Sequence, residues 1–393
     1  MPYVHDSWYV HVLMNTASNV NARPKTVRGV EQALSRQLRR LISNIGWIRE
    51  RTTPRGLRLD SVADATVHLG GGWRVDLSVE IKSELRPSAF MSWLANRPSH
   101  EARNAVPVLG LPAVSDRIAE LCRQAGWSWF DLAGNCWIDV PGVLHIERSG
   151  IPPLRGAPSR RASLATPEAA RVVRVLLSPA HAGQQWTQRE LRQETCWPRG
   201  SGKPRSLGLV NKVVRYLRDE GYVAPSDRGI RVRDPLGLLA AWRRVYRFDR
   251  HERHDLFTLL NGQALAKALA RAGEDSGNQI AYAAFSAAER QAPHVRQPKT
   301  WLYVERAALQ GLCRIGEAKE VDSGGNLVVL VPDDPGVLVT FEADDYLDEE
   351  QLGCTDPIQT YVDLLHCGGR GEEAAEAILE QRIVPAWKAA GIA

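Results

Sequence analysis

Residues 206–223 (SLGLVNKVVRYLRDEGYV) constrain the fold of this chain more than any other stretch. Apolar side chains recur there at helical spacing and predict one buried face, formed by Leu209, Val213, Tyr216 and Leu217. Polar and cationic side chains occupy the rest of the helix, and Gly221 is placed to end it. The pattern predicts a helix that packs on one side and presents cations on the other.

The segments on either side of this helix favour a particular arrangement. A short helix is expected at 187–196, and the arginine-rich stretch 222–233 has the pattern of a β-hairpin. Helix, turn, cationic helix and basic β-ribbon, in this order, are typical of a winged helix-turn-helix DNA-binding domain. A charged surface helix in another kind of α/β protein is the alternative, and winged helices also serve as protein-docking modules.

A recognition helix presents long polar side chains to base edges, and we expect Asn211, Lys212 and Arg215 to take this role. Cations in the preceding turn and in the hairpin are suited to contact phosphates, and Ser206 is expected either to cap the helix or to contact a phosphate. The predicted DNA-binding residues are Arg199, Lys203, Arg205, Ser206, Asn211, Lys212, Arg215, Arg228, Arg231 and Arg233.

The positive charge is concentrated in the middle of the chain. The 393 residues carry a formal net charge of +5, but residues 151–234 contain 16 lysines and arginines against 7 acidic residues. Residues 341–350 carry six acidic side chains and no basic one. The basic segment favours a polyanionic partner, whereas the acidic run is expected to be a solvated loop.

Composition argues against several classes of protein. Hydrophobic residues make up 44% and charged residues 24%, which is typical of a folded soluble protein. No apolar run approaches the roughly 20 residues of a transmembrane helix, and the N-terminus lacks a signal pattern. The six cysteines lack metal-binding spacing and are expected to be reduced thiols. We therefore expect a cytoplasmic protein without a membrane partner.

The N-terminal part alternates helices and strands. Helices are expected at 28–45 and 112–125, and strands at 63–69, 73–82, 104–109, 127–131 and 136–140. Residues 150–164 are rich in proline, glycine and arginine and are expected to be a basic linker. The first part of the chain is thus predicted to be a small α/β domain that ends near residue 149.

Thr166 and Pro167 are the N-cap and first residue expected of a helix at 168–177. Further on, helices are expected at 238–246, 261–271, 357–365 and 372–383, and strands at 302–304, 327–331 and 337–341. The predicted fold is α+β and multidomain. Its parts are an α/β domain (1–149), a linker (150–164), a winged helix (165–234) and a mixed α/β domain (235–393).

The strand at 73–82 carries a pattern found in nucleases. Glu80 and Lys82 share one face, and Asp64 stands on the preceding strand, which resembles the PD-(D/E)xK nuclease motif. Two carboxylates, Asp64 and Glu80, would hold a divalent cation such as Mg²⁺, and the lysine would activate water. Glu31 matches an acidic residue that many members carry on the helix before. The resemblance implies a restriction-endonuclease-like fold, used for binding rather than catalysis.

Four stretches of the chain together resemble the AbiEi antitoxin class of type IV toxin–antitoxin and abortive-infection (phage-defence) systems. They are the strand residues 79–82 (VEIK), the turn at 129–135 (WFDLAGN), the predicted winged helix (187–191 and 209–223), and the helix–glycine turn–helix at 355–364 and 369–376. Within the second stretch, Asp131 and Asn135 are expected to stabilise a tight turn.

The resemblance implies a transcriptional regulator that binds operator DNA, is often autoregulatory, and has a possible cognate toxin. We expect a homodimeric repressor that binds an inverted repeat in double-stranded DNA without a cofactor. A metal-dependent nuclease directed by the winged helix is the alternative and would require Mg²⁺. A third hypothesis is an antitoxin that binds only protein.

Overall fold

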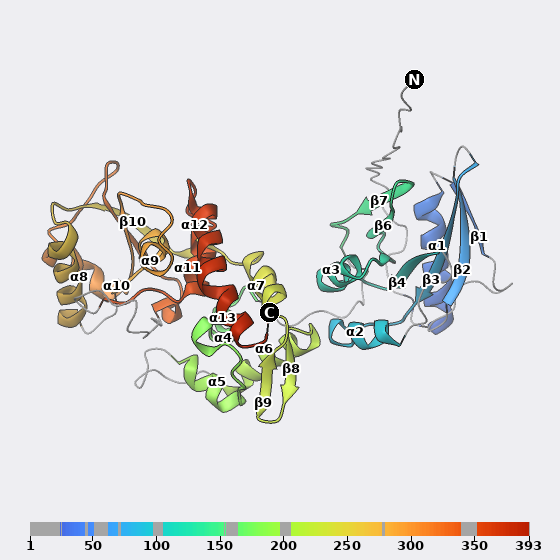
Figure 1. Ribbon diagram of the computed structural model, residues 1–393, viewed down its shortest axis with the longest axis horizontal. Coiled ribbons are helices and arrows are strands. Elements are labelled where there is room, and N and C mark those ends of the chain that lie inside the picture. The colour runs from blue at the N-terminus through green and yellow to red at the C-terminus, as the bar shows by residue number, and fades with distance from the viewer. Residues whose placement is uncertain are drawn as a thin grey trace, which may run out of the picture. The chain divides into compact units, whose positions relative to one another are not determined.

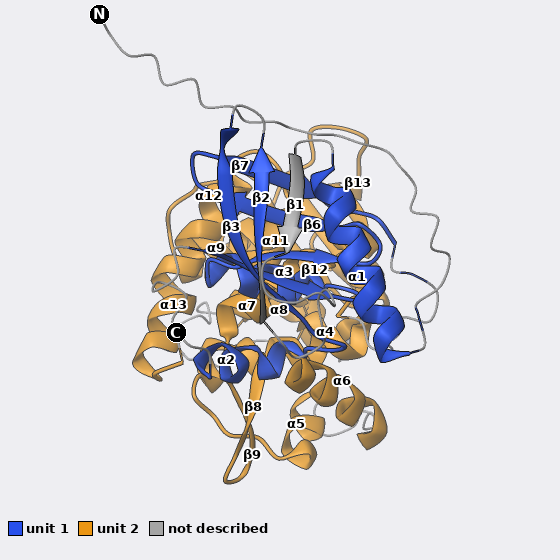
Figure 2. Cartoon of the chain, turned by 90° about the vertical axis from the view of Figure 1, so that its right-hand side faces the viewer, with its two compact units in different colours: residues 1–161 blue, residues 162–393 orange. Residues whose placement is uncertain are grey.

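The computed structural model of the protein shows two compact units, residues 1–161 and residues 162–393 (Figure 2). Each unit is described here by itself. The residues that the structure describes are 24, 26–43, 46–50, 62–69, 72–96, 105–152, 154, 164–196, 206–276, 280–338 and 352–392.

Unit 1 is built on a seven-stranded sheet in which the strands follow one another in chain order (Figure 1). The strands are β1 (Gly46–Glu50), β2 (Val62–Leu69), β3 (Arg74–Ile81), β4 (Val106–Leu111), β5 (Ser128–Asp131), β6 (Cys136–Val140) and β7 (Leu144–Arg148). The pairs β3–β4 and β4–β5 are parallel, and the remaining neighbours are antiparallel. Parallel neighbours need crossover connections, which here contain the helices α2 (Pro87–Ala95) and α3 (Asp116–Gln124).

Hydrophobic cores lie on both faces of this sheet. Helix α1 (Val27–Ile42) buries Leu34 and Leu38 in a core with Val79 and Ile81 of β3. Phe90 of α2 and Ile118 of α3 belong to a separate core with Leu109, which alternates with Val108 along β4. Unit 1 is therefore a helix–sheet–helix sandwich.

The predicted helices at 28–45 and 112–125 and all five predicted strands of this part are confirmed, with small shifts at their ends. The structure adds three elements that were not predicted, β1, β7 and α2. The restriction-endonuclease-like assignment stays a prediction.

The turn after β5 has the structural role expected of it. Asp131 Oδ1 accepts hydrogen bonds from the backbone N–H groups of Gly134 and Asn135, both at 2.9 Å. The Asn135 side chain donates to Asp131 Oδ2 and to the carbonyl of Ile151, and it accepts from the Ile151 N–H, each at 2.9 Å. One amide group thus fastens the chain after β7 to the β5–β6 turn.

Replacing Asn135 by alanine is expected to destabilise unit 1 by about 2–4 kcal/mol, because three hydrogen bonds are lost beside the buried Asp131 carboxylate. Urea unfolding monitored by tryptophan fluorescence measures the change. Asn96→Ala is the matched control: Asn96 is exposed and its side chain donates one hydrogen bond, to the Ser92 carbonyl. Equal stability of the two variants would contradict the structural role of Asn135.

Unit 2 begins with three helices and a hairpin. They are α4 (Pro167–Leu177), α5 (Gln188–Glu194), α6 (Leu207–Asp219) and the hairpin strands β8 (Val223–Ser226) and β9 (Gly229–Val232). The expected N-caps are confirmed, because Thr166 Oγ1 accepts from the Ala169 N–H and Ser206 Oγ accepts from the Leu209 N–H. Gly221, with φ +79°, follows the end of α6 as predicted.

The rest of unit 2 contains a five-stranded sheet in the order β11-β12-β14-β10-β13. Its strands are β10 (Glu252–Phe257), β11 (Ile280–Tyr282), β12 (Thr300–Val304), β13 (Lys319–Glu320) and β14 (Leu327–Val331). The helices are α7 (Pro235–Arg243), α8 (Gly262–Ser276), α9 (Ala284–Gln291), α10 (Arg306–Ile315), α11 (Pro357–Leu364), α12 (Gly371–Ile378) and α13 (Val384–Ala389), with a π-helical segment (Leu379–Ile383) before α13.

Two predictions in unit 2 are corrected. The prediction of a strand at 337–341 is wrong for its two described residues, since Val337 and Leu338 belong to a short 3-10 helix (Pro335–Leu338). Leu209 does not lie on the buried face of α6; that face consists of Val210, Val213, Val214 and Leu217. The predicted set of residues and the buried set both recur with helical spacing, so spacing alone does not distinguish them. The set that packs into the core is the one rich in valine.

A single core joins the first helices of unit 2 to its C-terminal helices. It contains Leu176 and Leu217 from the first part and Tyr361 and Trp387 from the last. The Trp387 indole N–H donates to the Leu177 carbonyl at the end of α4, at 2.9 Å. The division between residues 165–234 and 235–393 stays a prediction, but the two parts bury their apolar side chains together.

No helix in the described part of the chain is long and apolar enough to cross a membrane. All six cysteines are free thiols, as expected.

Candidate nucleic-acid interface

The candidate interface consists of the exposed face of α6 and the hairpin β8–β9. Lys212, Arg215 and Arg218 are exposed on α6, opposite its buried valines. On the hairpin, Arg231 and Arg233 are exposed on either side of the buried Val232, so they share a face as predicted. Among the described residues, no carboxylate lies within ion-pair distance of these five side chains.

Two of the predicted DNA-binding residues have partners within the protein. Arg228, beside the hairpin turn, lies 3.3 Å from the Glu190 carboxylate of α5. Asn211 accepts a hydrogen bond of 3.4 Å from the Gln188 amide and is half-buried. Ser206 caps α6. Arg199, Lys203 and Arg205 lie outside the described residues.

The hairpin is attached to the segment before α5 by backbone hydrogen bonds. Trp186 and Ile230 exchange two of them, at 2.8 and 2.9 Å, so β9 has Trp186 as a neighbour on its free side. A Cβ atom on Gly229 would lie 2.2 Å from the Trp186 carbonyl oxygen, and Gly229 has φ +147°, so only glycine fits there. The start of α5 and the hairpin are therefore held in one arrangement.

Helix α5 itself begins with a capping box. Thr187 Oγ1 accepts from the Glu190 N–H, and Glu190 Oε2 accepts from the Thr187 N–H at 2.8 Å. These hydrogen bonds and the nearby Arg228 lower the pKa of Glu190 below its usual range. Glu190 thus stays ionised, and it contacts both the start of α5 and the hairpin.

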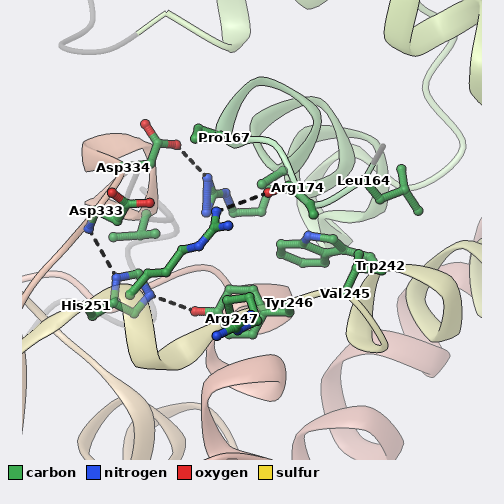
Figure 3. Close-up of a pocket in the computed structure, with 14 residues that line it drawn as sticks. Leu164, Pro167, Arg174, Trp242, Val245, Tyr246, Arg247, His251, Asp333 and Asp334 are labelled. Carbon is green, nitrogen blue, oxygen red and sulfur yellow. Dashed lines mark hydrogen bonds and ion pairs between the residues drawn. The ribbon is translucent and has the colours of Figure 1, made fainter. Parts of the chain in front are cut away.

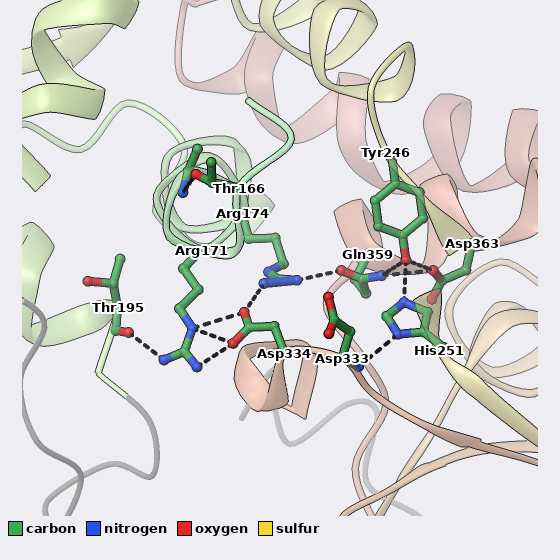
Figure 4. Close-up of polar contacts among 11 residues, drawn as sticks. Thr166, Arg171, Arg174, Thr195, Tyr246, His251, Asp333, Asp334, Gln359 and Asp363 are labelled. Atoms are coloured by element: carbon green, nitrogen blue, oxygen red, sulfur yellow. Dashed lines mark hydrogen bonds and ion pairs between the residues drawn. The ribbon is translucent and has the colours of Figure 1, made fainter. Parts of the chain in front are cut away.

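Behind the interface, a buried polar network reaches from α4 into the C-terminal half of unit 2 (Figure 4). Asp334 lies between two arginines of α4. Its carboxylate accepts from Arg171, with the Nε contacts at 2.9 Å, and from Arg174 at 3.1 Å. Burial alone would raise the pKa of Asp334, but the two guanidinium groups outweigh burial and lower it.

Each arginine also has a second partner. Arg171 donates to the Thr195 carbonyl, at the end of α5, at 3.2 Å. Arg174 donates to Gln359 Oε1 of α11 at 2.8 Å. The network therefore links α5, the helix before α6, to α11.

The network continues through a chain of hydrogen bonds on the far side of Gln359. Its amide donates to Asp363 Oδ1 and to the Tyr246 hydroxyl, both at 2.8 Å, and Tyr246 donates to Asp363 at 2.5 Å. His251 Nδ1 accepts from the Asp333 N–H at 3.3 Å. A neutral His251 therefore carries its proton on Nε2, which lies 2.9 Å from the Tyr246 oxygen and donates to it.

Burial moves the pKa values at the two ends of this chain in opposite directions. It raises the pKa of Asp363 to about 7, although Tyr246 and Gln359 hydrogen bonds lower it in part. Burial, with the charge of Arg174, lowers the pKa of His251 to about 4. Both groups are thus predominantly neutral between about pH 4 and pH 7.

A cavity of about 50 Å³ lies beside the network, lined by the start of α4, Arg174, Trp242 and Tyr246 (Figure 3). Pockets for organic ligands measure roughly 300–1,000 Å³. The cavity is suited to a few water molecules rather than to an organic effector.

The structure describes the residues of the nuclease hypothesis only in part, and their catalytic role stays a prediction. Glu80 is 1% exposed; its Oε1 accepts from the Trp93 indole at 3.0 Å and lies 3.3 Å from Lys82 Nζ. Glu31 is on α1, which packs against the opposite face of β3. The backbone of Asp64 pairs with Ser78, and its side chain is outside the described residues. No cluster of three metal-binding side chains occurs in the part of the chain that was described.

Comparison with known families gives a match in the C-terminal half of the chain. Residues 231–384 match the model of the family described as "Transcriptional regulator, AbiEi antitoxin, Type IV TA system". The AbiEi match runs from β9 to the first residue of α13 and includes Asp334, Gln359 and Asp363. No curated protein and no solved structure matches the chain.

The AbiEi match contains one of the four stretches on which the family resemblance was based, the helix–glycine turn–helix that the structure shows as α11 and α12. The other three stretches lie before residue 231. Arg171 and Arg174 also lie before it, so the buried network joins the matched region to helices outside it.

Sequence reasoning missed this network. One signal for it was present: Arg171 and Arg174 stand three residues apart in a helix whose other side chains from 172 to 177 are all apolar and buried. Two arginines without a solvent-facing side indicate buried partners.

Replacing Asp334 by alanine is expected to destabilise unit 2 by about 3–5 kcal/mol, because two buried arginines lose their shared carboxylate. Chemical unfolding of the full chain measures the change. Asp333→Ala is the matched control, since the Asp333 side chain is exposed and its contact to His251 uses the backbone. Similar stability of the two variants would refute the role given to Asp334.

Replacing Asp363 by asparagine is expected to alter the pH dependence of stability. In the folded protein Asp363 keeps its proton up to about pH 7, whereas unfolded aspartate releases it near pH 4, so its contribution to stability is lost as pH rises between these values. Relative to wild type, Asp363→Asn should therefore gain about 2 kcal/mol in free energy of unfolding between pH 5 and pH 7.

Urea unfolding at several pH values tests this expectation. His251 has the opposite pH dependence, because its folded pKa of about 4 lies below the unfolded value, but it is present in both proteins and cancels in the comparison. Asp322→Asn, at an exposed position, serves as the control. A constant difference between Asp363→Asn and wild type across this pH range would contradict the raised pKa.

Proposed function

We propose that the protein is a sequence-specific DNA-binding transcriptional regulator in which residues 165–234 form a winged helix and α6 enters the major groove. The observation that carries this proposal is the set of exposed cations on α6 and the hairpin: Lys212, Arg215, Arg218, Arg231 and Arg233, none of which forms an ion pair with a carboxylate among the described residues. Cations that are left without internal partners are suited to phosphates and base edges.

The AbiEi match supports the same class of function independently of the surface charge. The family it describes is one of transcriptional regulators and antitoxins of type IV systems. From this match we propose an autoregulatory repressor with a cognate toxin as a possible second partner. We further propose a cytoplasmic homodimer that binds an inverted repeat, since two-fold symmetric proteins bind two-fold symmetric sites. DNA binding in this proposal requires no metal or other cofactor.

The buried network connects the region that would bind a toxin with the helices that would bind DNA. A toxin bound to the matched region would act on α11 or on the segment of Asp334, and both contact the arginines of α4. Arg171 in turn holds the end of α5, which packs against α6. Occupancy of the matched region can thereby change DNA affinity through direct contacts.

The nuclease alternative has no support from the comparisons. The Trp93 indole and Lys82 both contact Glu80 Oε1, which is the kind of pairing that a buried structural carboxylate makes. We propose instead that unit 1 is a binding module. Mg²⁺-dependent cleavage of DNA, abolished by Glu80→Ala, would overturn this assignment.

DNA binding is tested by titrating the full chain with its own upstream region and with random DNA at about 150 mM salt. Alanine at Arg215 or Asn211 is expected to reduce discrimination between the two by about tenfold, because each bidentate base contact contributes about 1–3 kcal/mol. Arg231→Ala should weaken binding to both DNAs equally. It should also reduce the slope of log affinity against log salt concentration by about one, as expected when a phosphate contact is lost.

Arg314→Ala is a suitable control, because Arg314 lies on α10, outside the proposed interface. Equal affinity of the wild-type protein for upstream and random DNA would show that the chain does not act as a sequence-specific regulator.

A further inference from the structure

The start of α6 presents two leucines to solvent. Leu207 is 39% exposed and Leu209 is 37% exposed, and they flank the stripe of buried residues that contains Val210, Val213 and Leu217. The two leucines in the first turn of this helix are therefore not buried in the core. Within the described residues of 165–234, they are the large apolar side chains that remain exposed.

Exposed cations lie on the same helix as the two leucines and on α5. Lys212 and Arg215 follow on the exposed side of α6, and Arg189 is exposed on α5. Between the leucines, Gly208 has no side chain, and a Cβ built there would meet only Ser206 Oγ, at 3.6 Å. The backbone of this turn can thus approach a flat polyanionic surface closely.

The major groove of DNA offers one apolar group to a protein, the C5-methyl group of thymine. The N-terminal residues of a recognition helix, including its first turn, contact base edges. We propose that Leu207 and Leu209 contact thymine methyl groups and so determine thymine positions in the operator. This inference depends on the proposed DNA-binding function and adds the chemical group that is recognised.

The surrounding charge favours DNA over a protein as the occupant of this surface. A stable protein interface buries roughly 1,200–2,000 Å² and has a core poor in charged residues. Two leucines among exposed cations lack such a core. They do match a surface that alternates phosphates with small methyl groups.

Uracil differs from thymine only by the missing methyl group, which allows a direct test. The upstream region is synthesised once with dTTP and once with dUTP, and both fragments are titrated with the full chain. Losing a contacted methyl group is expected to weaken binding by about fourfold, and two such losses by about tenfold or more. Random DNA made with the same two nucleotides measures the effect on non-specific binding.

The double variant Leu207→Ala/Leu209→Ala should bind thymine DNA more weakly than wild type and should no longer distinguish thymine from uracil. Leu236→Ala is the matched control: Leu236 is 50% exposed on α7, outside the interface, and its variant should keep the full difference. Lys212→Ala should weaken binding to both fragments by the same factor. Circular dichroism melts confirm that the variants are folded.

The possible failures are distinguishable. Specific binding of wild type that is equal for thymine and uracil DNA would overturn this inference and leave the proposed regulator standing. A thymine preference that persists in the double variant would assign the effect to DNA shape and would also overturn it. No preference for the upstream region over random DNA would overturn the proposed function itself.

Discussion

The contact of Asp334 with Arg171 and Arg174 is the interaction on which unit 2 depends. Two cations and one carboxylate are buried together, and each arginine donates one further hydrogen bond, Arg171 to Thr195 and Arg174 to Gln359. A buried charge is tolerated only when it is paired and hydrogen-bonded. The relative positions of α4, α5, α11 and the segment after β14 are therefore coupled, because moving any one of them would leave a charge without its partner.

This coupling connects the region that matches a regulator family to helices outside the match, among them those of the proposed DNA-binding surface. The arginines contribute fixed hydrogen-bond geometry in addition to charge, since a guanidinium group holds several acceptors in one plane. The apolar core adds most of the burial, through side chains such as Leu217 and Trp387. The polar network then specifies one arrangement among those that the core would permit.

Local signals in the sequence predicted local structure well. Thr166, Ser206 and Gly221 marked helix ends that the structure confirms, because caps depend on neighbouring residues alone. The buried face of α6 was misjudged by one residue, since stripes beginning at Leu209 and at Val210 have the same period. The network was missed because Arg171 and Asp334 are 163 residues apart, and pairing over such a distance follows from the whole fold.

The ion pair of Arg228 with Glu190 has an electrostatic consequence for the approach to a duplex. An arginine that already has a carboxylate beside it adds almost nothing to the field felt at a distance. Attraction over long range would come from the other cations of the surface, and the hairpin tip would act only after docking, by exchanging Glu190 for a phosphate. Glu190 Oε2 would keep its bond to Thr187 during this exchange, so α5 would retain its first turn.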